Sequence, residues 1–184
     1  MIEIRLHGRG GQGAKTAANF IAMAAMEQGK FIQSFPEYGP ERSGAPMKTY
    51  ARISDEKIKT YAPIVNPDIV LVIDPTFIGE INVTEGLKED GILIVNTKLS
   101  PEKVKEKTGF SGKVHCVDAS SIAIEATGLN KPNVPILGAM IKITDLIAVE
   151  ALEKLVRKKF TEKIGKDKTE ATVQAIHKAY EKVI

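Results

Sequence analysis

The first residues that could do chemistry are the glycines of residues 8–13 (GRGGQG), because Gly8, Gly10 and Gly13 have the spacing G-x-G-x-x-G. Glycine permits a positive φ angle in a tight turn and lets the backbone approach a phosphate group closely. The free N–H groups at the start of a following helix attract an anion. The spacing therefore predicts a phosphate-contacting loop, whose candidate residues are Gly8, Arg9, Gly10, Gly11, Gly13 and Lys15.

Three interpretations of this loop remain open from the residues alone. It binds a dinucleotide, it binds another phosphate or anion, or it is a tight turn beside an empty anion pocket. A dinucleotide site usually has an Asp or Glu about 20 residues further on, after the second strand. Here that strand ends in Gln33, Ser34 and Phe35, and the P-loop spacing is also absent. The sequence therefore disfavours the dinucleotide and leaves the other two interpretations in place.

The other reactive side chains do not form a recognisable catalytic set. The three histidines lack metal-ligand spacing, so the sequence predicts no metal site. His115 and Cys116 are adjacent on a predicted strand and point to opposite faces, which argues against a Cys–His pair. His7 and Asp74 lie at the carboxyl ends of predicted strands, and we expect Asp74 to cap the turn that follows it. The sequence therefore predicts a binding edge without catalytic residues.

Alternating apolar patterns indicate the elements that hold this edge. We expect strands at 2–7, 31–35, 68–74, 91–96 and 113–119, with a hairpin of 47–53 and 57–61. We expect helices at 14–29, 77–89, from Ser100, from 119 to Gly128, and at 136–147, 148–160 and 169–183. Strands that alternate with helices predict an α/β fold with three layers (α/β/α), a mainly parallel sheet and an antiparallel hairpin addition. The chain is predicted to be one domain, 1–184, with an α/β core at 1–130 and a helical region at 131–184.

Composition excludes several classes of protein. The chain has 184 residues, 43% of them hydrophobic and 27% charged, which is not typical of disorder. It has no apolar run of the roughly 20 residues that a membrane helix needs. One cysteine, Cys116, excludes a disulfide framework or an iron–sulfur cluster held by this chain's own thiolates. We therefore expect a soluble, cytoplasmic protein.

The net charge of +3 is too small to predict a nucleic-acid partner. It arises from residues 150–184, which hold nine basic and six acidic side chains, and no aromatic ladder accompanies these lysines. We interpret them as a solvated helix face. Abundant Lys and Glu with few Asn, Gln and Cys residues favour a thermophilic source.

Several blocks, taken in order, resemble a known family. These are GRGGQG followed by AKTAANFIA, then SFPEYGPERSGAP, ARISDEKI, NPDIVLVIDP and NVPILGAM. They resemble the gamma subunits of 2-oxoacid:ferredoxin oxidoreductases, and most closely those of the four-subunit pyruvate:ferredoxin oxidoreductases (pyruvate synthases). The resemblance runs from Ile2 to about Phe160, and its most specific block is residues 34–46.

The resemblance implies a non-catalytic subunit of an enzyme that converts pyruvate and coenzyme A to acetyl-CoA, carbon dioxide and reduced ferredoxin. It places thiamine diphosphate, magnesium and the iron–sulfur clusters on the alpha, beta and delta subunits. The glycine loop would contact the phosphates of coenzyme A or pack against those subunits. The loop of residues 35–46 would be an interface element, because aromatic and arginine side chains suit a partner surface. Its candidate interface residues are Phe35, Tyr38, Glu41 and Arg42.

Two alternatives accompany this interpretation. The chain could serve a complex for another 2-oxoacid, such as 2-oxoisovalerate or indolepyruvate. It could also be a free-standing nucleotide-dependent oxidoreductase, although the missing ribose-binding acid argues against this.

Overall fold

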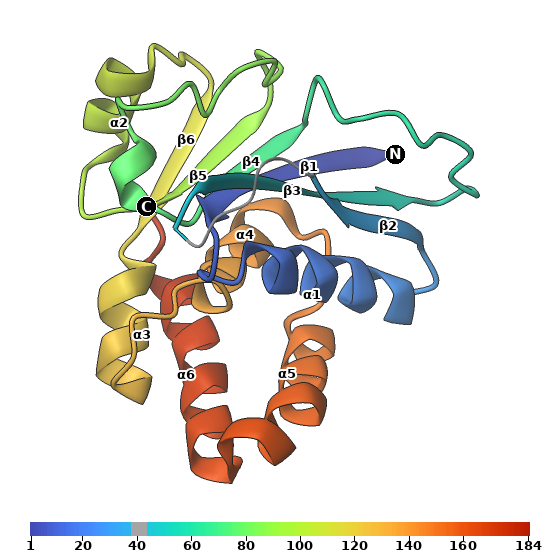
Figure 1. The fold of residues 1–184 in the computed structure, drawn as a ribbon, viewed down its shortest axis with the longest axis vertical. Helices are drawn as coiled ribbons and strands as arrows, with labels where there is room; N and C mark the ends of the chain where they lie inside the picture. The colour runs from blue at the N-terminus through green and yellow to red at the C-terminus, as the bar shows by residue number, and fades with distance from the viewer. Residues whose placement is uncertain (38–43) are drawn as a thin grey trace.

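The structure is a computed structural model, and it describes residues 1–37 and 44–184. In this part of the chain six strands form one sheet in the order β2-β3-β1-β4-β5-β6 (Figure 1). The pairs β1–β4, β4–β5 and β5–β6 are parallel, whereas β1–β3 and β2–β3 are antiparallel. The strands are β1 (Ile2–Arg9), β2 (Phe31–Pro36), β3 (Pro46–Ser54), β4 (Ile69–Val72), β5 (Ile92–Asn96) and β6 (Lys113–Val117).

Helices cover the two faces of the sheet unequally. Figure 1 shows a thick helical layer on one face, made of α1 (Ala14–Glu27), α3 (Ala119–Thr127), α4 (Pro135–Thr144), α5 (Val149–Ile164) and α6 (Lys166–Lys182). The opposite face carries α2 (Pro101–Thr108) and the short 3-10 helix η1 (Pro75–Phe77). The predicted α/β/α class is therefore confirmed, with one layer much thicker than the other.

The alternation of side chains along the strands produces two cores. Ile4 and Leu6 of β1 face α1 and the C-terminal helices in the larger core, and both are fully buried. Val70 and Val72 of β4 point the other way, into a smaller core with Phe77. β4 is apolar throughout because both of its faces are covered.

Small residues bring the helices close to the sheet and to each other. The buried face of α1 is rich in alanine, which lets this helix lie near β2 and β3. Gly138 of α4 lies against α6, where a Cβ atom would come within 2.0 Å of the carbonyl oxygen of Ile176. α1 is thus packed closely on the sheet, and the contact of Gly138 with α6 leaves no room for a larger side chain.

The predicted hairpin of 47–53 and 57–61 is wrong, although the antiparallel addition exists. β3 is already paired on both edges, by β1 and β2, so no edge is left for a further strand. The segment near residue 60 instead crosses the face of the sheet opposite α1. There the carbonyl of Thr60 accepts a hydrogen bond from Gln33 at 2.9 Å, and the carbonyl of Ala62 accepts one from Arg52 at 2.6 Å.

The predicted helix at 77–89 is also wrong. After η1 the chain makes a series of turns, because Gly79 and Gly86 take positive φ angles of 91° and 67° that a helix cannot contain. A Cβ atom on Gly86 would meet the carbonyl oxygen of Val65 at 2.1 Å. The last helix begins at Lys166 rather than at residue 169, because Gly165 alone separates it from α5.

Candidate functional site

The glycine loop joins β1 to α1 at the carboxyl edge of the parallel strands. Gly8 lies where β1 passes the start of α1, and a Cβ atom there would be 3.2 Å from that of Ala14. Gly11 and Gly13 have φ angles of 91° and 83°, which side chains disfavour. Gly13 is the N-cap residue of α1, and no side chain of residues 1–37 and 44–184 caps this helix. The N-terminus of α1 therefore presents its first amides without a side-chain partner from this part of the chain.

A cavity of about 350 Å³ adjoins this helix N-terminus. Gly11, Gly13 and Thr16 form one wall of the cavity, and the starts of α4 and α6 and the ends of α3 and α5 form the others. The lining from these helices is largely apolar and includes Ala123, Leu129, Val134, Pro135, Phe160 and Ile164. The cavity can therefore hold the apolar part of a ligand next to an anion-binding helix end.

Three lysines also line the cavity, Lys131 before α4, Lys163 in α5 and Lys168 in α6. They are exposed, and none of them forms an ion pair with another residue of the described chain. The solvated-face interpretation of the tail lysines is thus incomplete, because two of them belong to this cavity. Sequence reasoning missed all three, since only the packing of α4, α5 and α6 brings them to the loop.

The predicted site residues separate into two groups. Gly11 and Gly13 line the cavity, whereas Arg9 turns away from it toward β4. Lys15 is exposed on the first turn of α1, and Gly10 pairs through its backbone with Ala45. The loop itself is therefore placed as the sequence predicts, but its arginine has other partners.

Arg9 is held by contacts from several segments. Its Nε atom donates to Asp74 Oδ2 at 3.0 Å, and its two Nη atoms donate to the Gly44 carbonyl at 3.3 Å and to the Thr76 hydroxyl at 2.9 Å. The guanidinium also lies 4.7 Å from the centre of the Phe77 ring. Asp74 caps η1 by accepting from Thr76 N, which confirms the predicted cap.

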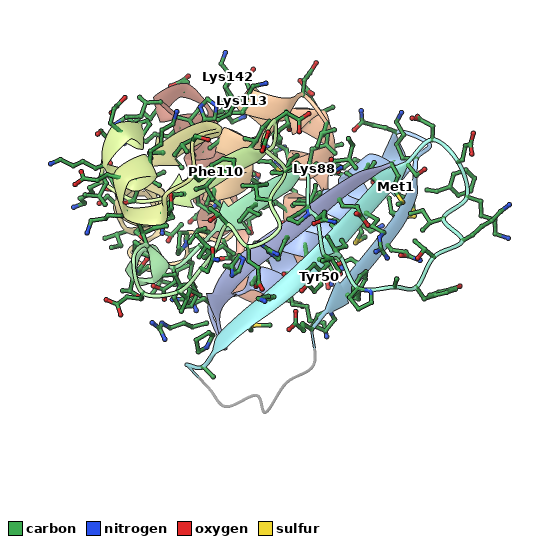
Figure 2. All side chains as sticks on the ribbon, turned by 90° about the horizontal axis from the view of Figure 1, so that it is seen from above. Met1, Tyr50, Lys88, Phe110, Lys113 and Lys142 are labelled. Atoms are coloured by element: carbon green, nitrogen blue, oxygen red, sulfur yellow. The ribbon has the colours of Figure 1, made fainter. Side chains whose placement is uncertain are left out.

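Of the four predicted interface residues, the structure describes Phe35. Its ring lies 5.3 Å from that of Tyr50, and the Arg52 guanidinium lies 5.4 Å from it. Tyr38, Glu41 and Arg42 lie outside the described residues. Figure 2 looks onto this side of the sheet and shows Tyr50 on β3, where no described helix crosses β1, β3 and β2.

His7 is buried on the same side of β1 and is not a site ligand. Its Nε2 atom accepts a hydrogen bond from Arg5 Nε at 3.0 Å, and Arg5 also donates to the carbonyls of Val83 and Glu85. Burial, with the nearby charges of Arg5 and Lys48, lowers the pKa of His7 to about 3. His7 is therefore neutral near pH 7 and serves to order Arg5 under the 83–85 segment.

The lowered pKa of His7 predicts that the folded chain loses stability in acid. The pKa of His7 in the folded chain lies below its ordinary value of 6.5, so protonation favours the unfolded chain. Its stabilising contribution is complete above about pH 6.5 and is lost progressively as the pH falls toward 3. We expect the His7→Gln variant to lose about 2 to 3 kcal/mol less than the parent between pH 7 and pH 4.5, as measured by urea unfolding. Equal losses in both chains would show that His7 does not titrate in this way.

The site departs from a dinucleotide-binding fold in its strand order. The strand that follows α1 lies at the antiparallel edge of the sheet, separated from β1 by β3. Glu37 comes directly after this strand, but its carboxylate accepts a hydrogen bond from the Tyr50 hydroxyl. Across residues 1–37 and 44–184, no group of His, Cys, Asp and Glu side chains is arranged to hold a metal ion. Within these ranges, no helix has both the length and the apolar character needed to cross a membrane.

We compared the sequence of this α/β chain, with its glycine loop, with the models of known protein families. Residues 3–182 match the family model for pyruvate ferredoxin/flavodoxin oxidoreductase, and the chain belongs to this family.

Individual relatives cover almost the whole chain. The pyruvate synthase subunit PorC of Thermotoga maritima is 48% identical over 181 residues, which are 98% of this chain and 94% of that protein. The pyruvate/ketoisovalerate oxidoreductases common subunit gamma of Thermococcus kodakarensis is 46% identical over 179 residues, 97% of each chain. The crystal structure of the Thermotoga maritima subunit superposes with a TM-score of 0.89 at 45% identity and covers 100% of this chain and 97% of that one. The gamma subunit of a keto/oxoacid ferredoxin oxidoreductase from Geobacter sulfurreducens has a TM-score of 0.74 at 26% identity, covering 98% and 97%.

Proposed function

We propose that this chain is the gamma subunit of a pyruvate:ferredoxin oxidoreductase and works together with alpha, beta and delta subunits. The observation that carries this proposal is the 48% identity to a pyruvate synthase subunit along 98% of the chain. The holoenzyme would convert pyruvate and coenzyme A to acetyl-CoA and carbon dioxide and reduce ferredoxin. The family relationship and the strand order both argue against the free-standing nucleotide-dependent oxidoreductase.

The chain's own residues do not suit the redox cofactors of such an enzyme. An iron–sulfur cluster needs several thiolates, and the sequence has only Cys116. This thiol is buried, and burial raises its pKa to about 11, so it is a poor metal ligand. We therefore assign thiamine diphosphate, magnesium and the clusters to the partner subunits and assign no catalytic residue here.

The contribution that the geometry supports is binding of coenzyme A. This substrate combines phosphate groups with an aromatic adenine ring whose faces pack against apolar side chains, and the cavity combines lysines and a helix N-terminus with apolar walls. The uncapped amides after Gly13 suit a phosphate, and Lys131, Lys163 and Lys168 suit the remaining charge. Lys15 extends this positive field on the first turn of α1. Arg9 contributes through the position of the loop, because its side chain is bound to Asp74.

The lysines provide the test. We expect the double variant Lys163→Ala and Lys168→Ala to raise the Michaelis constant for coenzyme A about tenfold in the reconstituted complex, because two exposed lysines together contribute about 1 to 2 kcal/mol to the binding of an anion. The constant for pyruvate should stay the same. A matched control removes Lys158 and Lys159, which are exposed on α5 and do not line the cavity. Equal constants in both variants would reject the coenzyme A site.

We further propose that the segment after Phe35 contacts the partner subunits. Phe35 lies on the sheet face that carries no described helix over β1, β3 and β2, next to Tyr50 and Arg52. Aromatic and arginine side chains are the residue types that dominate binding energy at protein interfaces. Tyr38, Glu41 and Arg42 complete the proposed contact surface.

Replacing Tyr38, Glu41 and Arg42 together with alanine is expected to abolish co-purification of the tagged chain with the other subunits, because the change removes the proposed contact side chains and keeps the length of the connection between β2 and β3. The cavity variant that lacks Lys163 and Lys168 serves as a control and should co-purify normally. Co-purification of the triple alanine variant at the parent yield would contradict the proposed interface.

A further inference from the structure

Asp74 receives an unusual number of hydrogen bonds at the end of β4. Its Oδ2 atom accepts from Arg9 Nε at 3.0 Å and from Gln12 Nε2 at 2.6 Å. Its Oδ1 atom accepts from the backbone N–H and the hydroxyl of Thr76, at 2.9 and 2.6 Å. We call Arg9, Gln12, Asp74 and Thr76 the Asp74 cluster. Asp74 is 4% exposed, so its carboxylate is a buried ion with four donors.

The Asp74 cluster joins three segments that are distant in sequence. Gln12 returns to the start of its own loop, where its Oε1 atom accepts from Arg9 N at 2.8 Å. Arg9 donates a hydrogen bond to the carbonyl of Gly44, with which the described segment 44–184 begins. Backbone bonds reinforce this contact, since Gly10 N donates to Ala45 at 2.9 Å and Gly44 N donates to Gly10 at 3.2 Å. One carboxylate therefore connects the glycine loop, the 44–45 segment and the η1 turn.

The cluster and the cavity meet in the glycine loop. Among the described residues that line the cavity, Gln12 is the one member of the Asp74 cluster, whereas Arg9, Asp74 and Thr76 lie outside its lining. On the other side, Asn133 contacts the end of the loop by donating to the Gly13 carbonyl at 3.3 Å. The loop is thus held at its start by Asp74 and at its end by Asn133.

The charge of Asp74 is needed for this arrangement. Burial opposes ionisation, but the hydrogen bonds from Thr76 and Gln12, together with the Arg9 charge, hold the pKa of the carboxyl below its ordinary value. The three partner residues present four N–H or O–H donors to the two carboxylate oxygens. An asparagine in the same place would turn its own NH₂ group toward one pair of these donors.

We propose that Asp74 is a positioning residue for coenzyme A: through Arg9 and Gln12 it fixes the glycine loop so that the first amides of α1 face the cavity. This inference rests on the proposed function of the cavity. Asp74 itself touches no ligand in this account. Its removal should therefore weaken binding of coenzyme A without changing the chemical step, because the loop must be ordered at the moment of binding.

The test is the Asp74→Asn variant in the complete four-subunit complex. We expect the Michaelis constant for coenzyme A to rise about fivefold or more, with kcat and the constant for pyruvate within about twofold of the parent. Hydrogen exchange of residues 9–13 should become faster. The matched control is Asp68→Asn, which lies before the same strand, accepts from Glu3 N and Lys88, and is remote from the loop. It should leave both constants and the exchange of residues 9–13 unchanged.

A milder variant keeps the proposal testable if Asp74→Asn does not fold. Thr76→Val removes the hydroxyl that links Asp74 to Arg9, and we expect a smaller rise in the same constant. An unchanged constant for coenzyme A in a folded Asp74→Asn complex, or a fall in kcat alone, would overturn the positioning role. If the lysine variants raise the constant while Asp74→Asn does not, this inference fails alone. If neither set raises it, the cavity is not the coenzyme A site and both proposals fail.

Discussion

Replacing Gly13 with alanine is expected to raise the Michaelis constant for coenzyme A at least tenfold and to lower the stability of the chain by about 2 kcal/mol or more. Gly13 has a φ angle of 83°, and an alanine there costs about 1 to 2 kcal/mol. The new Cβ atom would also lie 2.5 Å from Nδ2 and 2.9 Å from Cγ of Asn133. Asn133 must then move, and both residues line the proposed binding cavity.

Gly11 provides a matched control for this variant. Its φ angle is 91°, so alanine has a similar backbone cost there, but among the described residues no heavy atom apart from the chain neighbours lies within 4 Å of the added Cβ. We expect Gly11→Ala to lose about 1 kcal/mol and to bind coenzyme A much more tightly than Gly13→Ala. Thermal unfolding and coenzyme A titration of both variants separate the two costs. Equal effects on coenzyme A would show that the Asn133 contact is irrelevant to binding.

The glycine spacing located the candidate site, but sequence could not supply its charges. Gly11 and Gly13 lie where G-x-G-x-x-G predicts, because a tight strand-to-helix turn is a local property. Arg9 looked like a phosphate ligand, and only the packing of β4 beside β1 reveals Asp74 as its partner. Lys163 and Lys168 come from a region about 150 residues away in sequence, with no local pattern that links them to the loop.

The same division between local and distant information explains the fold predictions. Buried strands such as β4 and β5 were predicted because continuous apolar runs identify them directly. The segment 57–61 has strand-forming residues, yet β3 already has neighbours on both edges. The helix expected at 77–89 fails at Gly79 and Gly86, which take positive φ angles. At Gly86 the chain also passes close to the carbonyl group of Val65. Pairing and close approach are tertiary properties that residue periodicity does not report.

The second large effect concerns the complete enzyme. If the chain provides the coenzyme A site and an interface, the alpha, beta and delta subunits should react much more slowly without it. At limiting coenzyme A we expect their rate to fall at least about a hundredfold, because the binding energy of this substrate is no longer available. The control is the cofactor content of the three remaining subunits. Their thiamine diphosphate and iron–sulfur clusters should be retained, since this chain's single cysteine cannot ligate a cluster.

The most direct measurement is therefore coenzyme A-dependent reduction of ferredoxin by pyruvate, with the other three subunits assayed with and without this chain. We expect turnover to depend on adding the parent chain, the Gly13→Ala chain to restore it only at high coenzyme A concentration, and the chain alone to have no activity. Full turnover with an unchanged Michaelis constant for coenzyme A in the absence of the chain would contradict the proposed role of this subunit.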